Sequence, residues 1–195
     1  MTNTLETSNA KSIYYPPGGL LIWIIVFLEF ITFGAFLIVY LSFRQGDLET
    51  FNASQNMLNS TLGMINTIVL LTSGLFMAAG LVELKKGGRK AVTYLALTIA
   101  FGVLFMALKV FEYNEKIELG IGFSTNQFWT FYWLLTGFHL IHVLVAVILL
   151  SYMLIKTKSG VYNGTNFEDV ESVGVFWHMC DLIWIFLFPI LYLLH

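Results

Sequence analysis

Residues 19–43 read GLLIWIIVFLEFITFGAFLIVYLSF, an apolar run whose only charged residue is Glu29. A helix of about 20 apolar residues crosses the roughly 30 Å hydrocarbon core of a bilayer. Four more runs of this kind follow, at residues 63–84, 90–113, 128–155 and 172–194. We therefore predict an all-α, polytopic integral membrane bundle of five transmembrane helices. A polar tail over residues 1–18 precedes a single transmembrane domain over residues 19–195.

The composition excludes most other classes of protein. The chain has 195 residues, of which 57% are hydrophobic and 11% charged, whereas a soluble domain carries about 25% charged residues. A net charge of −2 with this apolar content excludes nucleic-acid binding and disorder. The single cysteine, Cys180, permits no disulfide framework within the chain. The first apolar run is too long for a cleavable leader, so we expect it to be retained.

The distribution of basic residues predicts the orientation in the membrane. Cytoplasmic loops carry an excess of lysine and arginine. The larger group falls on the N-terminal side of the predicted spans and consists of Lys11, Lys85, Lys86, Arg89, Lys90, Lys156 and Lys158. Arg44, Lys109 and Lys116 fall on the other side. We expect a cytoplasmic N-terminus and an outward C-terminus.

Five ionisable side chains are predicted to lie deep in the membrane. Glu29 is about 15 Å into the first span, near the midplane, and Asp181 is about 14 Å into the fifth. His139 and His142 lie in the fourth span, and His178 is one turn before Asp181. An ionised carboxylate at this depth costs about 2.5 to 3.5 kcal/mol. We therefore expect these groups to solvate one another.

Several roles are open to these polar side chains. For each histidine and for Thr136 the favoured interpretation is a structural one, a hydrogen-bonding contact between helices. A proton relay, a contact with lipid or another subunit, and a haem held by His178 with His139 or His142 are the functional alternatives. Glu29 is the residue for which a functional role is favoured. No nucleotide-binding loop, nucleophile elbow or metalloprotease motif occurs in the sequence.

Lys109 and Glu112 form a further charged pair. They are three residues apart near the outer end of the third span. We expect an ion pair that reaches the membrane interface.

Five sequence motifs, in order along the chain, resemble those of the haem-copper oxidase subunit III family. The two C-terminal motifs are TGFHLIHV at residues 136–143 and FWHMCDLIWIFL at residues 176–187. The others are LEFITFGAF at 28–36, NTIVLLTSG at 66–74 and FEY at 111–113. The chain is similar to the short, five-helix bacterial form of cytochrome c oxidase subunit III, which lacks the first two helices of longer members.

The resemblance implies an accessory subunit with no cofactor of its own in a multi-pass complex of the bacterial cytoplasmic membrane. Haem and copper are then expected in partner subunits: subunit I, the main contact, and subunit II. It also implies bound phospholipid, stabilisation of the oxidase during turnover, support of proton uptake during aerobic electron transport, and membership of a respiratory supercomplex. Glu29 matches the reactive buried carboxylate of the family. His139, His142, His178 and Asp181 match polar positions of the last two helices, with no catalytic residue or metal ligand among them.

Three alternatives remain open from the sequence. Short members of the same family accompany nitric oxide reductases, so the substrate of the complex is undetermined. A stand-alone proton-coupled transporter would use Glu29, Asp181 and the histidines as a relay, although internal repeats are absent. A b-type cytochrome would bind haem through the histidines and show a Soret band in the isolated chain.

Overall fold

The computed structural model describes residues 16–194, and these form six helices. The helices are α1 (Leu20–Gly46), α2 (Leu48–Gln55), α3 (Ser60–Lys85), α4 (Ala91–Glu118), α5 (Gln127–Lys158) and α6 (Glu168–Tyr192). All except α2 are long and apolar enough to cross a membrane. Over the described range β pairing is limited to one isolated bridge, between Asn163 and Asn166. The predicted all-α bundle of five transmembrane helices is confirmed.

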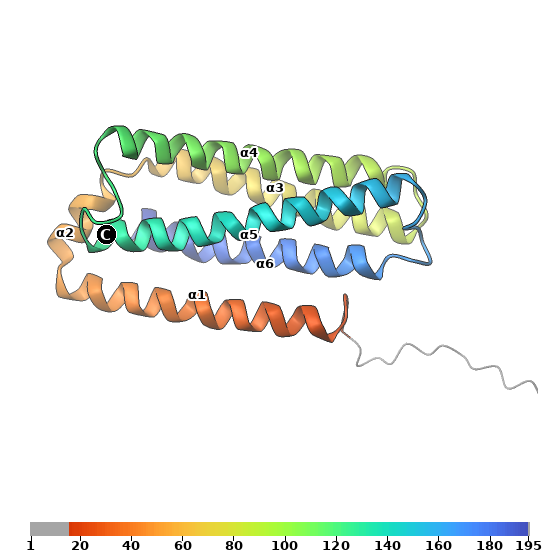
Figure 1. Ribbon diagram of the computed structural model, residues 1–195, viewed down its shortest axis with the longest axis horizontal. Helices are drawn as coiled ribbons and strands as arrows, with labels where there is room; N and C mark the ends of the chain where they lie inside the picture. Colours follow the sequence, from red (N-terminus) through yellow and green to blue (C-terminus); the bar gives the residue numbers. More distant parts are fainter. Residues whose placement is uncertain (1–15, 195) are drawn as a thin grey trace, which may run out of the picture.

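Helices α3, α4, α5 and α6 form a bundle, and α1 runs along its edge (Figure 1). Of the other long helices, α1 contacts α5 and α6. The loops at residues 86–90 and 159–167 share one end of the bundle with the start of α1, and we call this the N-terminal end. The segments at 47–59 and 119–126 lie at the opposite, C-terminal end with the last described residues. Most of the tail predicted for residues 1–18 lies outside the described residues.

Short polar side chains set the helix starts at the C-terminal end. Side-chain oxygens of Asp47, Asn59 and Asn126 accept hydrogen bonds from the backbone N–H groups of Thr50, Leu62 and Trp129, at 3.1, 3.0 and 3.0 Å. Each bond satisfies one donor of a first helical turn.

Glycines with a left-handed backbone follow two of the long helices. Gly120 follows α4 with φ +75°, and Gly160 follows α5 with φ +80°. This left-handed backbone is open to glycine without steric cost.

Helix α2, which the sequence did not predict, closes the C-terminal end of the bundle. The side chain of Phe51 is fully buried, with its ring centroid 5.4 Å from that of Tyr40 and 5.9 Å from that of Phe128. The Ser54 hydroxyl accepts a hydrogen bond from the Asn126 amide at 2.8 Å. This short helix is therefore held by an aromatic anchor and by polar contacts of its side chains.

Large aromatic side chains and small residues together make the core between α3, α4, α5 and α6. Trp129, Trp177 and Trp184 are each at most 1% exposed. Gly102 on α4 makes room for this packing, since a Cβ at that position would lie 2.5 Å from Cη2 of Trp177. Cys180 is fully buried and packs as a small core residue.

Candidate functional site

Glu29 on α1 and His142 on α5 form an acid–base pair between helices. Oε1 of Glu29 lies 3.2 Å from Nε2 of His142. Nδ1 of the same ring lies 2.8 Å from the carbonyl oxygen of Phe138. Because a carbonyl only accepts, Nδ1 carries a hydrogen, and the contact at Nε2 requires one further proton. The pair therefore shares a proton, held by the ring or by the carboxyl, and is neutral overall in either case.

Aromatic rings enclose this pair. The His142 ring lies edge-on to Phe138 and Phe33, with centroids 4.6 and 5.7 Å away. The side chains of Glu29 and His142 are 22% and 11% exposed. An isolated charge in such surroundings is costly, whereas a hydrogen-bonded neutral pair is tolerated. This geometry allows Glu29 to occupy the middle of a transmembrane helix.

Asp181 and His178 form a second acid–base pair, on one face of α6. Oδ2 of Asp181 lies 3.2 Å from Nδ1 of His178. The Asp181 side chain is 7% exposed, but that of His178 is 43% exposed. Gly74 on α3 makes room for the pair, since a Cβ there would overlap the Asp181 carboxylate. The two acid–base pairs thus differ: the first is enclosed between α1 and α5, and the second opens on the surface between α3 and α6.

His139 lies apart from both pairs. It is fully buried, and neither ring nitrogen has a hydrogen-bond partner within the described part of the chain. Its ring stacks on Trp184 with centroids 5.3 Å apart and meets Phe105 edge-on at 5.8 Å. His139 and His142 are three residues apart on α5 and both meet Phe33 edge-on, but their other neighbours differ.

The three membrane histidines are therefore engaged separately. His142 contacts Glu29, His178 contacts Asp181, and His139 is enclosed by aromatic rings. Among residues 16–194, no group of three or more histidine, cysteine or acidic side chains could hold a metal ion. The arrangement gives no support to the haem-binding alternative.

Thr136 links α4 to α5. Its hydroxyl donates to the carbonyl oxygen of Tyr132 at 2.6 Å and accepts from the hydroxyl of Tyr113 at 2.8 Å. The side chain is 1% exposed. Both contacts are internal to the bundle, as expected of a packing residue.

Lys109 and Glu112 form a buried network that sequence reasoning placed wrongly. The ion pair is present, with Nζ 3.0 Å from Oε2, but each side chain is 1% exposed and does not reach the interface. Lys109 Nζ also donates to the hydroxyls of Tyr132 at 3.3 Å and Tyr192 at 3.0 Å. These hydroxyls donate in turn to Oε1 of Glu112, at 3.0 and 2.7 Å. The network therefore joins α4, α5 and α6 through four side chains.

Aromatic faces complete the surroundings of the Lys109 ammonium. Ring centroids of Tyr113, Tyr132, Trp184 and Tyr192 lie 4.9, 5.1, 5.3 and 5.6 Å from Nζ. A desolvated cation gains about 2 kcal/mol from such a contact. The spacing of Lys109 and Glu112 predicts the ion pair. Nothing in the sequence indicates which aromatic side chains of α5 and α6 surround it.

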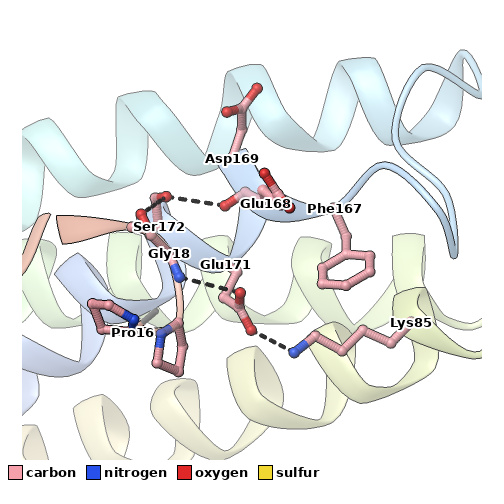
Figure 2. A pocket seen from close by; sticks show the side chains of 10 residues that line it. Pro16, Gly18, Lys85, Phe167, Glu168, Asp169, Glu171 and Ser172 are labelled. Atoms are coloured by element: carbon pink, nitrogen blue, oxygen red, sulfur yellow. Dashed lines mark hydrogen bonds and ion pairs between the residues drawn. The ribbon is translucent and has the colours of Figure 1, made fainter. Parts of the chain in front are cut away.

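Three sets of polar contacts hold α1 to the bundle, and the first is at the N-terminal end (Figure 2). Figure 2 shows the Glu171 carboxylate between the Gly18 backbone and Lys85: it accepts from Gly18 N–H at 3.1 Å and pairs with the Lys85 ammonium. Ser172 Oγ donates to the Gly18 carbonyl at 2.6 Å. These residues line a polar cavity of about 380 Å³. The start of α1 is thus tied to α3 and α6, and we call this set of contacts the inner clasp.

The other two sets lie farther along α1. The pair of Glu29 and His142 is near the middle of the helix. At its end, Nη2 of Arg44 donates to Oδ1 of Asn52 and to the carbonyl oxygen of Leu194, both at 2.9 Å. Helix α1 is therefore fixed at its start, middle and end.

The fold and these pairs define a class: a polytopic helical membrane protein that pairs carboxyl and imidazole side chains within its transmembrane bundle. Residues 18–195 match the family model described as cytochrome c oxidase subunit III. The chain is 32% identical over 178 residues to cytochrome c oxidase subunit 3 of Thermostichus vulcanus, covering 90% of this chain and 86% of that one. It is 28% identical over 174 residues to the same subunit of Alkalihalophilus pseudofirmus, covering 88% and 84%. The chain belongs to the cytochrome c oxidase subunit III family, as the resemblance predicted.

One relative bears on the partners of this family. The chain is 26% identical over 178 residues, 88% of its length, to heme-copper oxidase subunit I+III of Aeropyrum pernix, of which this stretch is 22%. The name of that relative indicates that subunits I and III share one polypeptide there. Members of the subunit III family are non-catalytic subunits that associate with the catalytic subunits of haem-copper oxidases.

Proposed function

We propose that this chain is the accessory subunit III of a respiratory haem-copper oxidase that uses oxygen. In this role it packs beside subunit I, together with subunit II, and stabilises the catalytic subunit during turnover. Haem and copper lie in those partners, and electrons pass through them. The observation that carries the proposal is the match to the subunit III family over residues 18–195.

The stabilising role is supported by the rigidity of the bundle. The Lys109–Glu112 network joins three helices, and polar contacts fix α1 at its start, middle and end. A helical surface held in this way keeps its shape when a partner packs against it, because little order has to be gained on binding.

Lipid binding is supported by two apolar cavities beside α1. One, of about 190 Å³, lies between α1 and α5 and is lined by Phe36, Leu134, Leu135 and Phe138. The other, of about 200 Å³, lies between α1 and α6 and is lined by Phe30, Phe33, Gly34, Leu37, Ile183 and Phe186. Acyl chains of phospholipids match the chemistry of both linings. Such lipid would fill the spaces on both sides of α1.

Support of proton uptake is assigned to the two acid–base pairs. Glu29 with His142, and Asp181 with His178, each hold a carboxyl beside an imidazole, an arrangement that can take up and release a proton. His139 and Thr136 contribute packing in this proposal, as their surroundings are internal to the bundle.

The proposed location is the bacterial cytoplasmic membrane, with the N-terminal end inside. Arg44, Lys109 and Lys116, the basic residues toward the C-terminal end, are at most 9% exposed. Lys86 and Arg89, in the loop after α3, are exposed. The basic residues open to a membrane surface therefore lie toward the N-terminal end, which favours its placement on the cytoplasmic side.

The test is purification of an affinity-tagged chain from native membranes in mild detergent, with an optical spectrum and mass spectrometry of the product. We expect haem absorbance and co-purified subunits I and II, and oxygen consumption by the complex. The same membranes without the tag are the control. Nitric oxide reduction in place of oxygen consumption would assign the chain to a nitric oxide reductase. A chain that came down alone and colourless would refute the proposal and favour the transporter.

A further inference from the structure

A groove of about 420 Å³ runs along the outer surface of the bundle between α3 and α6. Gly74 and Ala78 line it on α3, and His178 and Asp181 line it on α6, among leucine and isoleucine side chains. His178 and Asp181 lie on either side of the middle of the 25-residue helix α6, and Gly74 lies close to the middle of α3. The polar part of the groove is therefore near the bilayer midplane.

The acid–base pair in this groove is incompletely satisfied. The His178 side chain is 43% exposed, and within the described chain its Nε2 has no hydrogen-bond partner. Oδ1 of Asp181 is buried and has no partner among residues 16–194. In contrast, the His142 ring is 11% exposed and uses both nitrogens. Hydrocarbon offers no hydrogen bond, so an imidazole at this depth requires a polar partner from outside the chain.

The depth and shape of the groove limit what that partner can be. A phospholipid headgroup lies about 15 Å from the midplane and does not reach the pair. Acyl chains carry no hydrogen-bonding group. Gly74 is covered by the Asp181 carboxylate, but Ala78 is exposed in the groove and its small side chain allows another helix to approach α3 closely. A transmembrane helix with a polar side chain fits both features.

The chemistry of the pair specifies the polar group. At this depth a pair that is neutral overall is favoured, and it holds one shared proton between Oδ2 of Asp181 and Nδ1 of His178. Nε2 of the ring then carries a hydrogen in either arrangement of the shared proton. The partner side chain is therefore an acceptor, such as a hydroxyl or an amide oxygen.

We propose that the groove between α3 and α6 seats a transmembrane helix of the catalytic subunit, which accepts a hydrogen bond from Nε2 of His178. Asp181 is the positioning residue that orients the imidazole. The choice of the catalytic subunit rests on the proposed function and on the relative in which subunits I and III share one chain.

Site-specific photocrosslinking in native membranes tests the proposal. A diazirine-bearing amino acid of leucine size replaces Leu182 in the groove or, as a matched control, Val103 on the surface of α4. These residues are 45% and 47% exposed, and Val103 lies near the middle of its helix. We expect position 182, but not 103, to form a cross-link to the haem-bearing subunit, identified by peptide mass spectrometry. Cross-links from 182 only to lipid or to a second copy of this chain, or equal capture from both positions, would overturn the proposal.

A pair of blocking variants provides an independent measurement. Ala78→Trp fills the groove, whereas Val103→Trp places the same side chain on the surface of α4. We expect the amount of catalytic subunit retained in detergent to fall at least tenfold for the first variant and to stay unchanged for the second. His178→Phe keeps an aromatic ring but removes the donor, and should weaken the complex about three- to eighteenfold, the range of hydrogen bonds between membrane helices. Unchanged retention in both groove variants would overturn the proposal.

The wild-type chain separates this proposal from the proposed function. If it co-purifies with the haem-bearing subunit while position 182 captures something else, the groove is wrongly assigned and the accessory role stands. If it does not co-purify with that subunit, both are refuted.

Discussion

Replacing Glu112 with glutamine would leave the ammonium of Lys109 buried without its counter-charge. The two side chains are each 1% exposed and their charged atoms are 3.0 Å apart. Removal of one partner from a buried ion pair costs about 3 to 5 kcal/mol. The hydroxyls of Tyr132 and Tyr192 and the surrounding ring faces would still stabilise the cation. We therefore expect a loss near the lower limit, about 3 kcal/mol, or more than a hundredfold in the unfolding equilibrium.

The reciprocal and double variants make this reasoning quantitative. Lys109→Met leaves a buried carboxylate that keeps two tyrosine donors, so we expect a similar loss of about 3 kcal/mol. The double variant Lys109→Met/Glu112→Gln contains neither charge and should lose about 1 kcal/mol or less, because apolar or neutral replacement of a whole buried pair is nearly neutral. The coupling energy between the two positions is then several kcal/mol.

The assay is unfolding of the purified chain by sodium dodecyl sulfate in mixed micelles, followed by tryptophan fluorescence. Trp184 lies 5.3 Å from the ammonium and reports on the network directly. Additive losses in the double variant, or a change below about 0.5 kcal/mol in Glu112→Gln, which is the scale of an ordinary surface substitution, would refute a buried, mutually compensated pair.

Three further predictions concern other parts of the bundle. Glu29→Gln should insert normally and leave the haem spectrum of the purified complex unchanged. It should shorten the active lifetime of the complex in an oxygen-uptake assay, because the amide keeps a hydrogen bond to His142 but cannot share its proton. Loss of haem would contradict the accessory role. Gly102→Ala should lower the free energy of unfolding by about 1 to 3 kcal/mol in the same detergent assay, because the new Cβ overlaps Trp177. The control Gly137→Ala, with nothing within 4 Å of its Cβ position, should be neutral or slightly stabilising. Equal losses of stability in the two variants would contradict the overlap with Trp177. Burial raises the pKa of Tyr162 in the loop before α6, and its hydrogen bond to Asp169 raises it further. The stability of the fold should therefore fall as pH rises above about 10, the ordinary pKa of tyrosine. Thermal unfolding compared between pH 9 and 11 should show a smaller fall in Tyr162→Phe than in the wild type.

The transmembrane helices could be predicted because their signal is local. Apolar runs such as residues 19–43 reflect the thickness of hydrocarbon, and no tertiary contact is needed to recognise them. Helix α2 gave no such signal, since its eight residues, LETFNASQ, are largely polar. Its position depends on Phe51 reaching Tyr40 and Phe128, which are distant in sequence.

For the candidate site, the sequence predicts only how deep in the membrane each polar side chain lies along its helix. The rise per residue indicates that Glu29 and Asp181 lie deep in the membrane, but it does not give the rotation of one helix against another. His139 and His142 share a helical face by spacing, yet one contacts Trp184 and the other Glu29. Which imidazole meets which carboxylate is decided by how α1, α5 and α6 pack.

The fastening of α1 has a consequence for synthesis of the protein. Helix α1 is made first, but Glu171 of the inner clasp lies 153 residues after Gly18, and Leu194 lies 150 residues after Arg44. His142, the partner of Glu29, is made only after α3 and α4. At translation rates of about 5 to 20 residues per second, α1 waits about 6 to 30 seconds for these contacts. During that interval Glu29 lacks its partner, and an unpaired carboxyl at this depth is costly. We therefore expect the insertion machinery to retain α1 until α5 has been made.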